Sequence, residues 1–344
     1  MSDATQVLVT GASGFIGSHC IIQLLEKGYR VRGTLRSMNR ADSIRGIIAK
    51  HTDNVDALSF AEADLTRDEG WVDATTDCPL ILHVASPFPL DNPKHENDLI
   101  IPAREGTLRL LRAAKESGAR KVVQTSSVAA IAYGHKKKRN QSFTEDDWSD
   151  PNSKTIEPYA KSKTLAEMAA WKYMETEKPQ FDLAVINPGA VLGPVLESDY
   201  GTSAEIVLRI LQGGLPGMPR LGFEIVDVRD VASLHILAME NASAAGQRFP
   251  CVAGYRWFED IGPVLLENFP EFSKKIPTKV LPNWMMHIAA MLGQFPKSAL
   301  SELGNKRSVS NQKAVGLLGW EPRSPEDAIL ATAQALIDQG VVKP

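Results

Sequence analysis

A glycine-rich turn near the start of the chain constrains the fold more than any other feature of the sequence. Residues 7–9 form a short apolar run, residues 10–17 contain Gly11, Gly14 and Gly17, and residues 15–27 have the apolar spacing of a helix. A turn that bends sharply between a buried strand and a helix favours glycine, because the backbone must approach neighbouring atoms closely. This segment therefore predicts a strand–turn–helix unit of an α/β fold.

The same alternation of strands and helices continues through the first half of the chain. Strand-like segments with helix-like segments between them are predicted at residues 29–35, 57–61, 80–84, 121–125 and 181–186. Repeated units of this kind indicate a doubly wound parallel sheet, with ligands bound at the carboxyl ends of its strands.

The pattern changes after Pro188, where Gly and Pro become frequent and the alternation is lost. A smaller lobe is predicted there, interleaved with the main domain because residues 226–250 return to the strand–helix pattern. We expect residues 1–190 and about 226–250 to form a dinucleotide-binding Rossmann domain. Residues 191–225 and 251–344 are expected to form a substrate-binding lobe.

The predicted turn has the chemistry of a phosphate-binding loop. Unpaired N–H groups at the start of a helix attract the pyrophosphate of a dinucleotide. The spacing is Gly-x-x-Gly-x-x-Gly, which differs from Gly-x-Gly-x-x-Gly and points to a different branch of the same fold. The candidate cofactor-binding residues of this turn are Gly11, Ser13, Gly14, Phe15, Ile16 and Gly17.

The end of the second predicted strand favours NADP over NAD. An acidic residue there would bind the ribose 2′-hydroxyl and repel a 2′-phosphate, but this chain has none. Arg32, Arg36 and Arg40 surround the strand end instead, and a guanidinium can bind the 2′-phosphate in a fork. Asp64 and Leu65, after the third predicted strand, are candidates to contact the adenine, although Asp64 also suits an ordinary turn.

Tyr159 and Lys163 form the candidate catalytic pair. A spacing of four places both on one helix face, where the ammonium is expected to favour ionisation of the phenol. Lys161 lies on another face and is expected to be solvated or structural. Residues 125–127, Thr-Ser-Ser, close the predicted fifth strand with hydroxyls suited to bind a substrate oxygen. The combination predicts hydride transfer at a carbonyl, with Tyr159 moving the proton.

These motifs resemble those of the extended short-chain dehydrogenase/reductase family. Within it, the chain is similar to the group of dihydroflavonol reductases, cinnamoyl-CoA reductases and microbial aldehyde and ketone reductases. The similarity covers most of the first 195 residues, in the blocks at residues 10–18, 83–87, 125–127, 159–167 and 187–194.

The resemblance implies a role for each matching residue. Ser127 would bind the carbonyl oxygen, Tyr159 would donate the proton, and Lys163 would also hold the nicotinamide ribose. It further implies that Arg36 binds the 2′-phosphate and that Ala85 faces the ribose and phosphate region. The segment from Pro188 would bind the nicotinamide carboxamide.

The expected activity is NADPH-dependent reduction of an aldehyde or ketone. Plant dihydroflavonol reductases have an asparagine where this chain has Ala132, which argues against a dihydroflavonol substrate. One alternative is a hydroxysteroid or sugar-nucleotide dehydrogenase or epimerase of the same family. Another, of a different class, is a non-catalytic NADP-binding sensor or scaffold.

Composition excludes several other classes of function. A formal net charge of −3 provides no broad positive field for nucleic acid or a membrane surface, and residues 136–139 are predicted to be a solvated basic loop. The histidines lack metal-ligand spacing, and His83 is expected to be a core residue. The expected partner is a small-molecule carbonyl compound, with monomer and homodimer both open.

The sequence also predicts a cytoplasmic location. Three scattered cysteines suit neither a disulfide framework nor a zinc site. Residues 1–6 lack the basic region of a signal peptide. The apolar segment 285–295 is far shorter than the roughly 20 residues that span a bilayer. Trp257, Trp284, Met285 and Met286 are interpreted either as core or as the wall of an apolar pocket.

Overall fold

The computed structural model describes residues 4–87, 95–135, 141–197, 201–293, 295 and 297–344. The predicted basic loop at residues 136–139 lies outside them.

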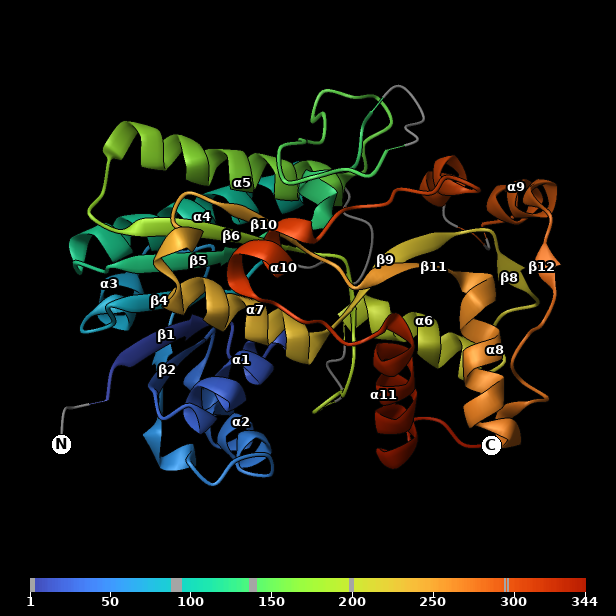
Figure 1. Cartoon of the computed structure of the whole chain (residues 1–344), viewed down its shortest axis with the longest axis horizontal. Helices are drawn as coiled ribbons and strands as arrows, with labels where there is room; N and C mark the ends of the chain where they lie inside the picture. The colour runs from blue at the N-terminus through green and yellow to red at the C-terminus, as the bar shows by residue number, and fades with distance from the viewer. Residues whose placement is uncertain (1–3, 88–94, 136–140, 198–200, 294, 296) are drawn as a thin grey trace.

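The centre of the molecule is a seven-stranded parallel sheet, as the strand pattern predicts (Figure 1). Its strand order is β3-β2-β1-β4-β5-β6-β10, so the direction of winding reverses between β1 and β4. In sheets of this kind the reversal opens a crevice at the carboxyl ends of the strands. The strands are β1 Gln6–Thr10, β2 Arg30–Leu35, β3 Leu58–Glu62, β4 Leu80–His83, β5 Lys121–Thr125, β6 Asp182–Pro188 and β10 Arg248–Cys251.

Helices cover both faces of this sheet, and a separate apolar core fills each side. One face carries α1 Phe15–Glu26, α2 Ala41–Ile48, α7 Val228–Glu240 and α10 Gln312–Leu318; the other carries α3 Trp71–Thr75, α4 Asn97–Glu116 and α5 Pro158–Glu177. Short 3₁₀ turns are η1 Met38–Arg40, η2 Val55–Ala57, η3 Val128–Ala130, η4 Ala242–Ala244, η5 Pro270–Phe272 and η6 Lys297–Glu302. The two buried faces explain why the central strands are almost wholly apolar.

A smaller lobe lies beside the carboxyl edge of the sheet, on the right of Figure 1. It contains the three-stranded sheet β7-β9-β11 and the strand pair β8–β12, packed around an apolar core of its own. Its elements are β7 Ala190–Leu192, α6 Gly201–Leu211, β8 Met218–Pro219, β9 Gly222–Asp227, β11 Gly254–Trp257, α8 Phe258–Asn268, β12 Val280–Leu281, α9 Asn283–Met291 and α11 Pro325–Asp338.

The chain passes between the two lobes more often than the sequence predicts. After β11 to η6 in the smaller lobe, α10 returns and packs on α7 and β10. Ala314, Leu318 and Trp320 belong to the core of the main domain, and the Trp320 indole N–H donates to the carbonyl of Asp230 at 3.0 Å. The segment 312–320 therefore belongs with the main domain, and the predicted assignment of all of 251–344 to the smaller lobe does not match the packing.

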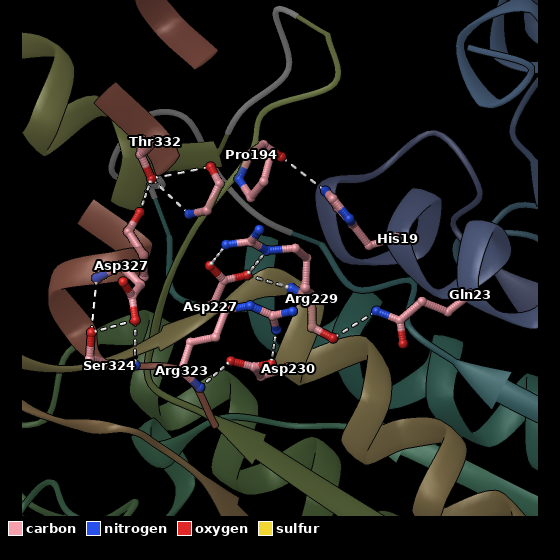
Figure 2. Close-up of polar contacts among 12 residues, drawn as sticks. His19, Gln23, Pro194, Asp227, Arg229, Asp230, Arg323, Ser324, Asp327 and Thr332 are labelled. Atoms are coloured by element: carbon pink, nitrogen blue, oxygen red, sulfur yellow. Dashed lines mark hydrogen bonds and ion pairs between the residues drawn. The ribbon is translucent and has the colours of Figure 1, made fainter. Parts of the chain in front are cut away.

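Polar contacts join the two lobes next to the helix that follows the glycine turn (Figure 2). His19 on α1 bonds the carbonyl of Pro194 at 2.9 Å, and burial lowers its pKa to about 4. On the other side, the Thr332 hydroxyl of α11 accepts a bond from the Gly193 N–H at 2.7 Å. The segment that follows β7 is thus held between α1 and α11.

The apolar helix α9 packs on the rest of the protein through only part of its surface. Trp284 is 63% exposed and Met285 40% exposed, whereas Met286 is buried. Among the described residues, no helix combines the length and the apolar character needed to cross a membrane.

Candidate active site

The glycine turn connects β1 to α1 at the crevice where the strand order reverses. Gly11 has φ +71°, and a Cβ on it would lie 3.1 Å from the Cα of Ala85. A Cβ on Gly17 would lie 2.2 Å from the carbonyl oxygen of Gly11. Both positions therefore require glycine, and the turn is fixed to β2 by a bond from the Gly11 N–H to the Thr34 hydroxyl at 3.1 Å.

The start of α1 is built to accept an anion. Gly14 is the N-cap and provides no side chain to the first turn, and the first bond within the helix runs from the Ser18 N–H to the Gly14 carbonyl. The N–H groups of the first turn have no acceptor within the helix. The side-chain-free cradle and these N–H groups fit the pyrophosphate of a dinucleotide.

The three candidate arginines have different surroundings in the structure. Arg36 follows β2 directly, is exposed, and its guanidinium makes no hydrogen bond or ion pair with the described residues. Arg40 pairs with Glu197 at 2.7 Å. Arg32 points away from the strand end and donates to the carbonyls of Asp73, Ala74 and Thr76 at 2.7 to 3.2 Å, where it caps the end of α3. These contacts give Arg32 a structural role at the end of α3 and do not support the prediction of Arg32 as a cofactor residue.

Asp64 and Leu65 follow β3 as the sequence predicts, and both have structural contacts. The Asp64 carboxylate accepts bonds from the N–H and the hydroxyl of Thr66 at 2.8 and 2.7 Å, which holds its pKa below the ordinary value. The Leu65 carbonyl accepts a bond from Arg109 at 2.8 Å. The Asp64 side chain is thus a turn-forming carboxylate, the alternative that the sequence left open.

The end of β4 brings Ala85 against the glycine turn. The Ala85 N–H donates to the Thr10 hydroxyl at 2.9 Å, and the same hydroxyl bonds the Nδ1 atom of His83 at 2.9 Å. Burial lowers the pKa of His83 to about 3, so this imidazole is neutral near pH 7. His83 is a buried core residue, as the sequence predicts.

Ser127 lies at the carboxyl end of β5, where it caps the η3 turn. Its hydroxyl accepts a bond from the Ala129 N–H at 3.1 Å and lies 3.4 Å from the carbonyl of Pro188 at the end of β6. The Ser127 hydroxyl also lies close enough to the Tyr159 hydroxyl to favour a lower pKa of Tyr159. Residues from β5, β6 and α5 therefore meet at one point on the edge of the sheet.

Tyr159 and Lys163 share the face of α5 that packs on the sheet. The Lys163 ammonium lies 5.8 Å from the centre of the Tyr159 ring and donates to the Ser86 hydroxyl at 2.7 Å. Lys161, which points elsewhere, pairs with Glu96 at 2.9 Å and is structural. The helix thus brings the three candidate catalytic side chains together.

The ionisation of Tyr159 differs from the expectation. Burial raises the pKa of Tyr159 to about 12, and the Ser127 hydrogen bond offsets only part of this effect. Burial also lowers the pKa of Lys163 to about 8, against the raising effect of Glu167. The cost of placing a phenolate among buried groups exceeds the attraction of an ammonium that bonds Ser86, so Tyr159 remains protonated near pH 7.

A buried polar cluster beneath these residues was not predicted from the sequence. Glu167, fully buried, accepts bonds from Ser126, Asn187 and Arg248. Glu167 follows Lys163 by four residues, the same spacing that singles out Tyr159 and Lys163. That spacing was the available signal, but the partners on β5, β6 and β10 are distant in sequence.

The fold and this cluster define a Rossmann-fold protein with a serine–tyrosine–lysine constellation beside a dinucleotide-type turn. A model of the NAD dependent epimerase/dehydratase family matches residues 7–251, and the chain belongs to this family. This confirms the predicted membership of the extended short-chain dehydrogenases/reductases.

Individual relatives are reductases. Cinnamoyl-CoA reductase CAD2 of Medicago truncatula is 36% identical over 277 residues, which cover 79% of this chain and 83% of the relative. The yeast methylglyoxal/isovaleraldehyde reductase Gre2, solved with NADPH, is 28% identical with a TM-score of 0.82 and covers 98% of this chain and 100% of its own. Gre2 of Candida albicans, also solved with NADPH, is 30% identical with a TM-score of 0.79 and coverage of 97% and 98%.

Proposed function

We propose that this protein reduces the carbonyl group of an aldehyde or ketone to an alcohol, with NADPH as the hydride donor. The observation that carries the proposal is that Ser127 and Tyr159 lie together, with Lys163 one helical turn away, beside the glycine turn. The printed activities of the relatives, which are reductases of small carbonyl compounds, support the same reaction class.

Ser127 and Tyr159 act on the carbonyl oxygen. Their hydroxyls are in contact with each other, so both can bind one substrate oxygen between them. Tyr159 is protonated near pH 7 and donates its proton to that oxygen as negative charge develops there. Lys163, buried beside the ring, stabilises the phenolate that remains. NADPH, when bound, supplies the hydride that the carbonyl carbon accepts.

The residues proposed to hold the cofactor surround this pair. The turn residues Gly11, Ser13, Gly14, Phe15, Ile16 and Gly17 would surround the pyrophosphate, and the N–H groups in the first turn of α1 would bind it. Arg36 would bind the 2′-phosphate, because its guanidinium is exposed and makes no ion pair with the described residues. Ala85 and Pro188 lie at the ends of β4 and β6 beside the turn and the serine, respectively. Tyr159 and Lys163 would contact the nicotinamide ribose.

The cytosol is the proposed location, and a small carbonyl compound is the proposed partner. Cys20, Cys78 and Cys251 are free and buried, which supports a reducing compartment.

The test is consumption of NADPH and of NADH with a panel of aromatic and aliphatic aldehydes, α-diketones and β-ketoesters. We expect turnover with a strong preference for NADPH. Tyr159→Phe removes the proton donor and should lower kcat by at least about 100-fold, because a positioned acid contributes roughly 10²- to 10⁴-fold. Tyr173→Phe is the matched control, since Tyr173 lies on the same helix and only donates to the Leu111 carbonyl at 3.4 Å.

Three results would contradict the proposal or part of it. NADPH binding without reduction of any compound in the panel would indicate a sensor or scaffold. Tightly retained NAD in the purified protein would indicate an epimerase. If Tyr159→Phe and Tyr173→Phe both kept the wild-type turnover, the assigned proton donor would be wrong.

A further inference from the structure

Glu167 lies at the centre of a buried polar cluster directly beneath the candidate active site. One carboxylate oxygen accepts bonds from the Ser126 hydroxyl at 2.5 Å and the Asn187 amide at 2.8 Å. The other accepts a bond from the Trp171 indole at 3.3 Å and pairs with Arg248 at 2.5 Å. One side chain of α5 is therefore bonded to β5, β6 and β10.

Each partner of Glu167 at the strand ends is linked directly to Ser127, either by a peptide bond or by a hydrogen bond. Ser126 precedes Ser127, and the Asn187 amide that bonds Glu167 also donates to the Ser127 carbonyl at 3.2 Å. Glu167 follows Lys163 by one helical turn on the buried face of α5. The carboxylate thus fixes the end of β5 relative to the helix that carries Tyr159 and Lys163.

Arg248 balances the charge of Glu167 and is itself firmly held. Its guanidinium donates to the carbonyls of Glu145 and Asp147 at 2.6 and 2.8 Å and lies 3.7 Å from the centre of the Trp148 ring. It is 7% exposed. A buried ion pair therefore lies one helical turn along α5 from Lys163.

We propose that Glu167 is a positioning residue of the reduction: it holds the Ser126–Ser127 strand end against α5 and, with Arg248, sets the electrostatic potential in which the Lys163 ammonium works. The proposal rests on the carbonyl reduction proposed above.

The charged and titratable groups around Lys163 determine whether each substitution raises or lowers the Lys163 pKa. Tyr159 lies above it on α5, neutral His83 faces it from β4, and Glu167 lies one turn below it. Arg248 reaches the far side of Glu167 from β10. Since Glu167 raises the pKa of Lys163 against burial, its loss should lower that pKa, and loss of Arg248 should raise it.

The experiment compares Glu167→Gln with Arg248→Met in the full-length enzyme. Activity requires the Lys163 ammonium, so kcat/KM falls as the pH rises through the Lys163 pKa. We expect this fall to move to lower pH in Glu167→Gln, by on the order of one pH unit. In Arg248→Met it should move to higher pH, because the positive charge that opposes Glu167 is removed.

A second readout does not depend on activity. The pH dependence of acetic anhydride labelling, followed by mass spectrometry, reports the pKa of the Lys163 amine in the cofactor-free protein. Lys172 on the same helix, with a side chain 67% exposed, is the internal reference. The same two variants should shift the Lys163 labelling curve in opposite directions and leave that of Lys172 unchanged.

Loss of a single partner leaves a buried charge unpaired and can prevent folding. The double variant Glu167→Gln/Arg248→Met removes both charges, and its profile should return to near the wild-type position. If one single variant does not fold, the other single and the double variant still test the sign.

Shifts in the same direction, or no shift in folded variants, would overturn the role of Glu167 while leaving the reduction itself intact. A wild-type enzyme that labels as expected but reduces no carbonyl would instead overturn the proposed function.

Discussion

Arg36 is the side chain on which the choice of cofactor depends. It occupies the end of β2, where an acid would select NAD, and it makes no ion pair with the described residues. Its two sequence neighbours among the arginines are already bound, Arg40 to Glu197 and Arg32 to the end of α3. A guanidinium without another partner is suited to bind a phosphate.

Arg36→Met should therefore weaken NADPH binding and leave NADH binding unchanged. A charge-assisted hydrogen bond contributes roughly 2 kcal/mol, which corresponds to about 30-fold in Kd. Fluorescence titration of both cofactors measures the change. Arg32→Met is the control, since it should lower stability but preserve the preference. An equal loss of affinity for NADPH and NADH would contradict the assigned contact.

The residue types at the site could be predicted from the sequence, but their ionisation could not. The spacing of Tyr159 and Lys163 places them on one helix face, and the structure brings them together with Ser127. Burial nevertheless raises the pKa of Tyr159. This burial could not be predicted from the spacing, because the residues that surround Tyr159 come from several separate elements. For the same reason the structural contacts of Arg32 could not be predicted: its acceptors lie some forty residues away in sequence.

At the scale of elements, the turn between β1 and α1 can form only because the backbone at Gly17 lies very close to the carbonyl of Gly11. Gly17 lies in the first turn of α1 against the carbonyl of Gly11. Gly46 in α2 is exposed, and a Cβ there would meet no atom within 4 Å. The two helical glycines therefore differ in what a methyl group would do.

Gly17→Ala should destabilise the protein by about 1–3 kcal/mol, because the added carbon overlaps the backbone. It should also abolish measurable NADPH binding by displacing the first turn of α1. Gly46→Ala should raise stability by up to about 1 kcal/mol, since alanine favours the helix, and leave binding unchanged. Thermal unfolding and cofactor titration of both variants provide the comparison. Normal NADPH affinity in Gly17→Ala would show that the turn tolerates a side chain.

The glycine turn and its neighbouring elements were predictable because strand, turn and helix are continuous in sequence. The predicted helix over 15–27 is α1 at Phe15–Glu26. The bonds that join α5 to β5, β6 and β10 were not predictable, since Arg248 lies 81 residues from Glu167. A periodicity shows which face of a helix is buried, but not which strand it meets.

The whole molecule buries three neutral histidines, which makes its stability depend on pH. Burial lowers the pKa of His19 and His235 to about 4 and that of His83 to about 3. Their ordinary value is 6.5, so in the window from about 6.5 down to 4 the unfolded chain binds protons that the folded protein does not. The free energy of unfolding should therefore fall as the pH falls through this window.

Urea unfolding at pH 7 and at pH 5 should show this loss, with each histidine contributing about 1.4 kcal/mol per pH unit near the lower end. His19→Gln retains a donor for the Pro194 carbonyl but binds no proton, so the pH dependence should become weaker by one such contribution. His287→Gln, at an exposed position of α9, is the control for the substitution itself. An unaltered slope in His19→Gln would exclude His19 from the acid response.

The path of the chain through the two lobes limits how the protein can be truncated or recombined with a relative. The smaller lobe is built from three separate stretches, 190–227, 254–309 and 325–338, with α7, β10 and α10 of the main domain between them. No single cut therefore separates the smaller lobe from the main domain, and removal of the last thirty or so residues would open both cores. A chimera has to exchange several stretches at once. In this architecture, the substitution of individual residues is far simpler than the exchange of a module.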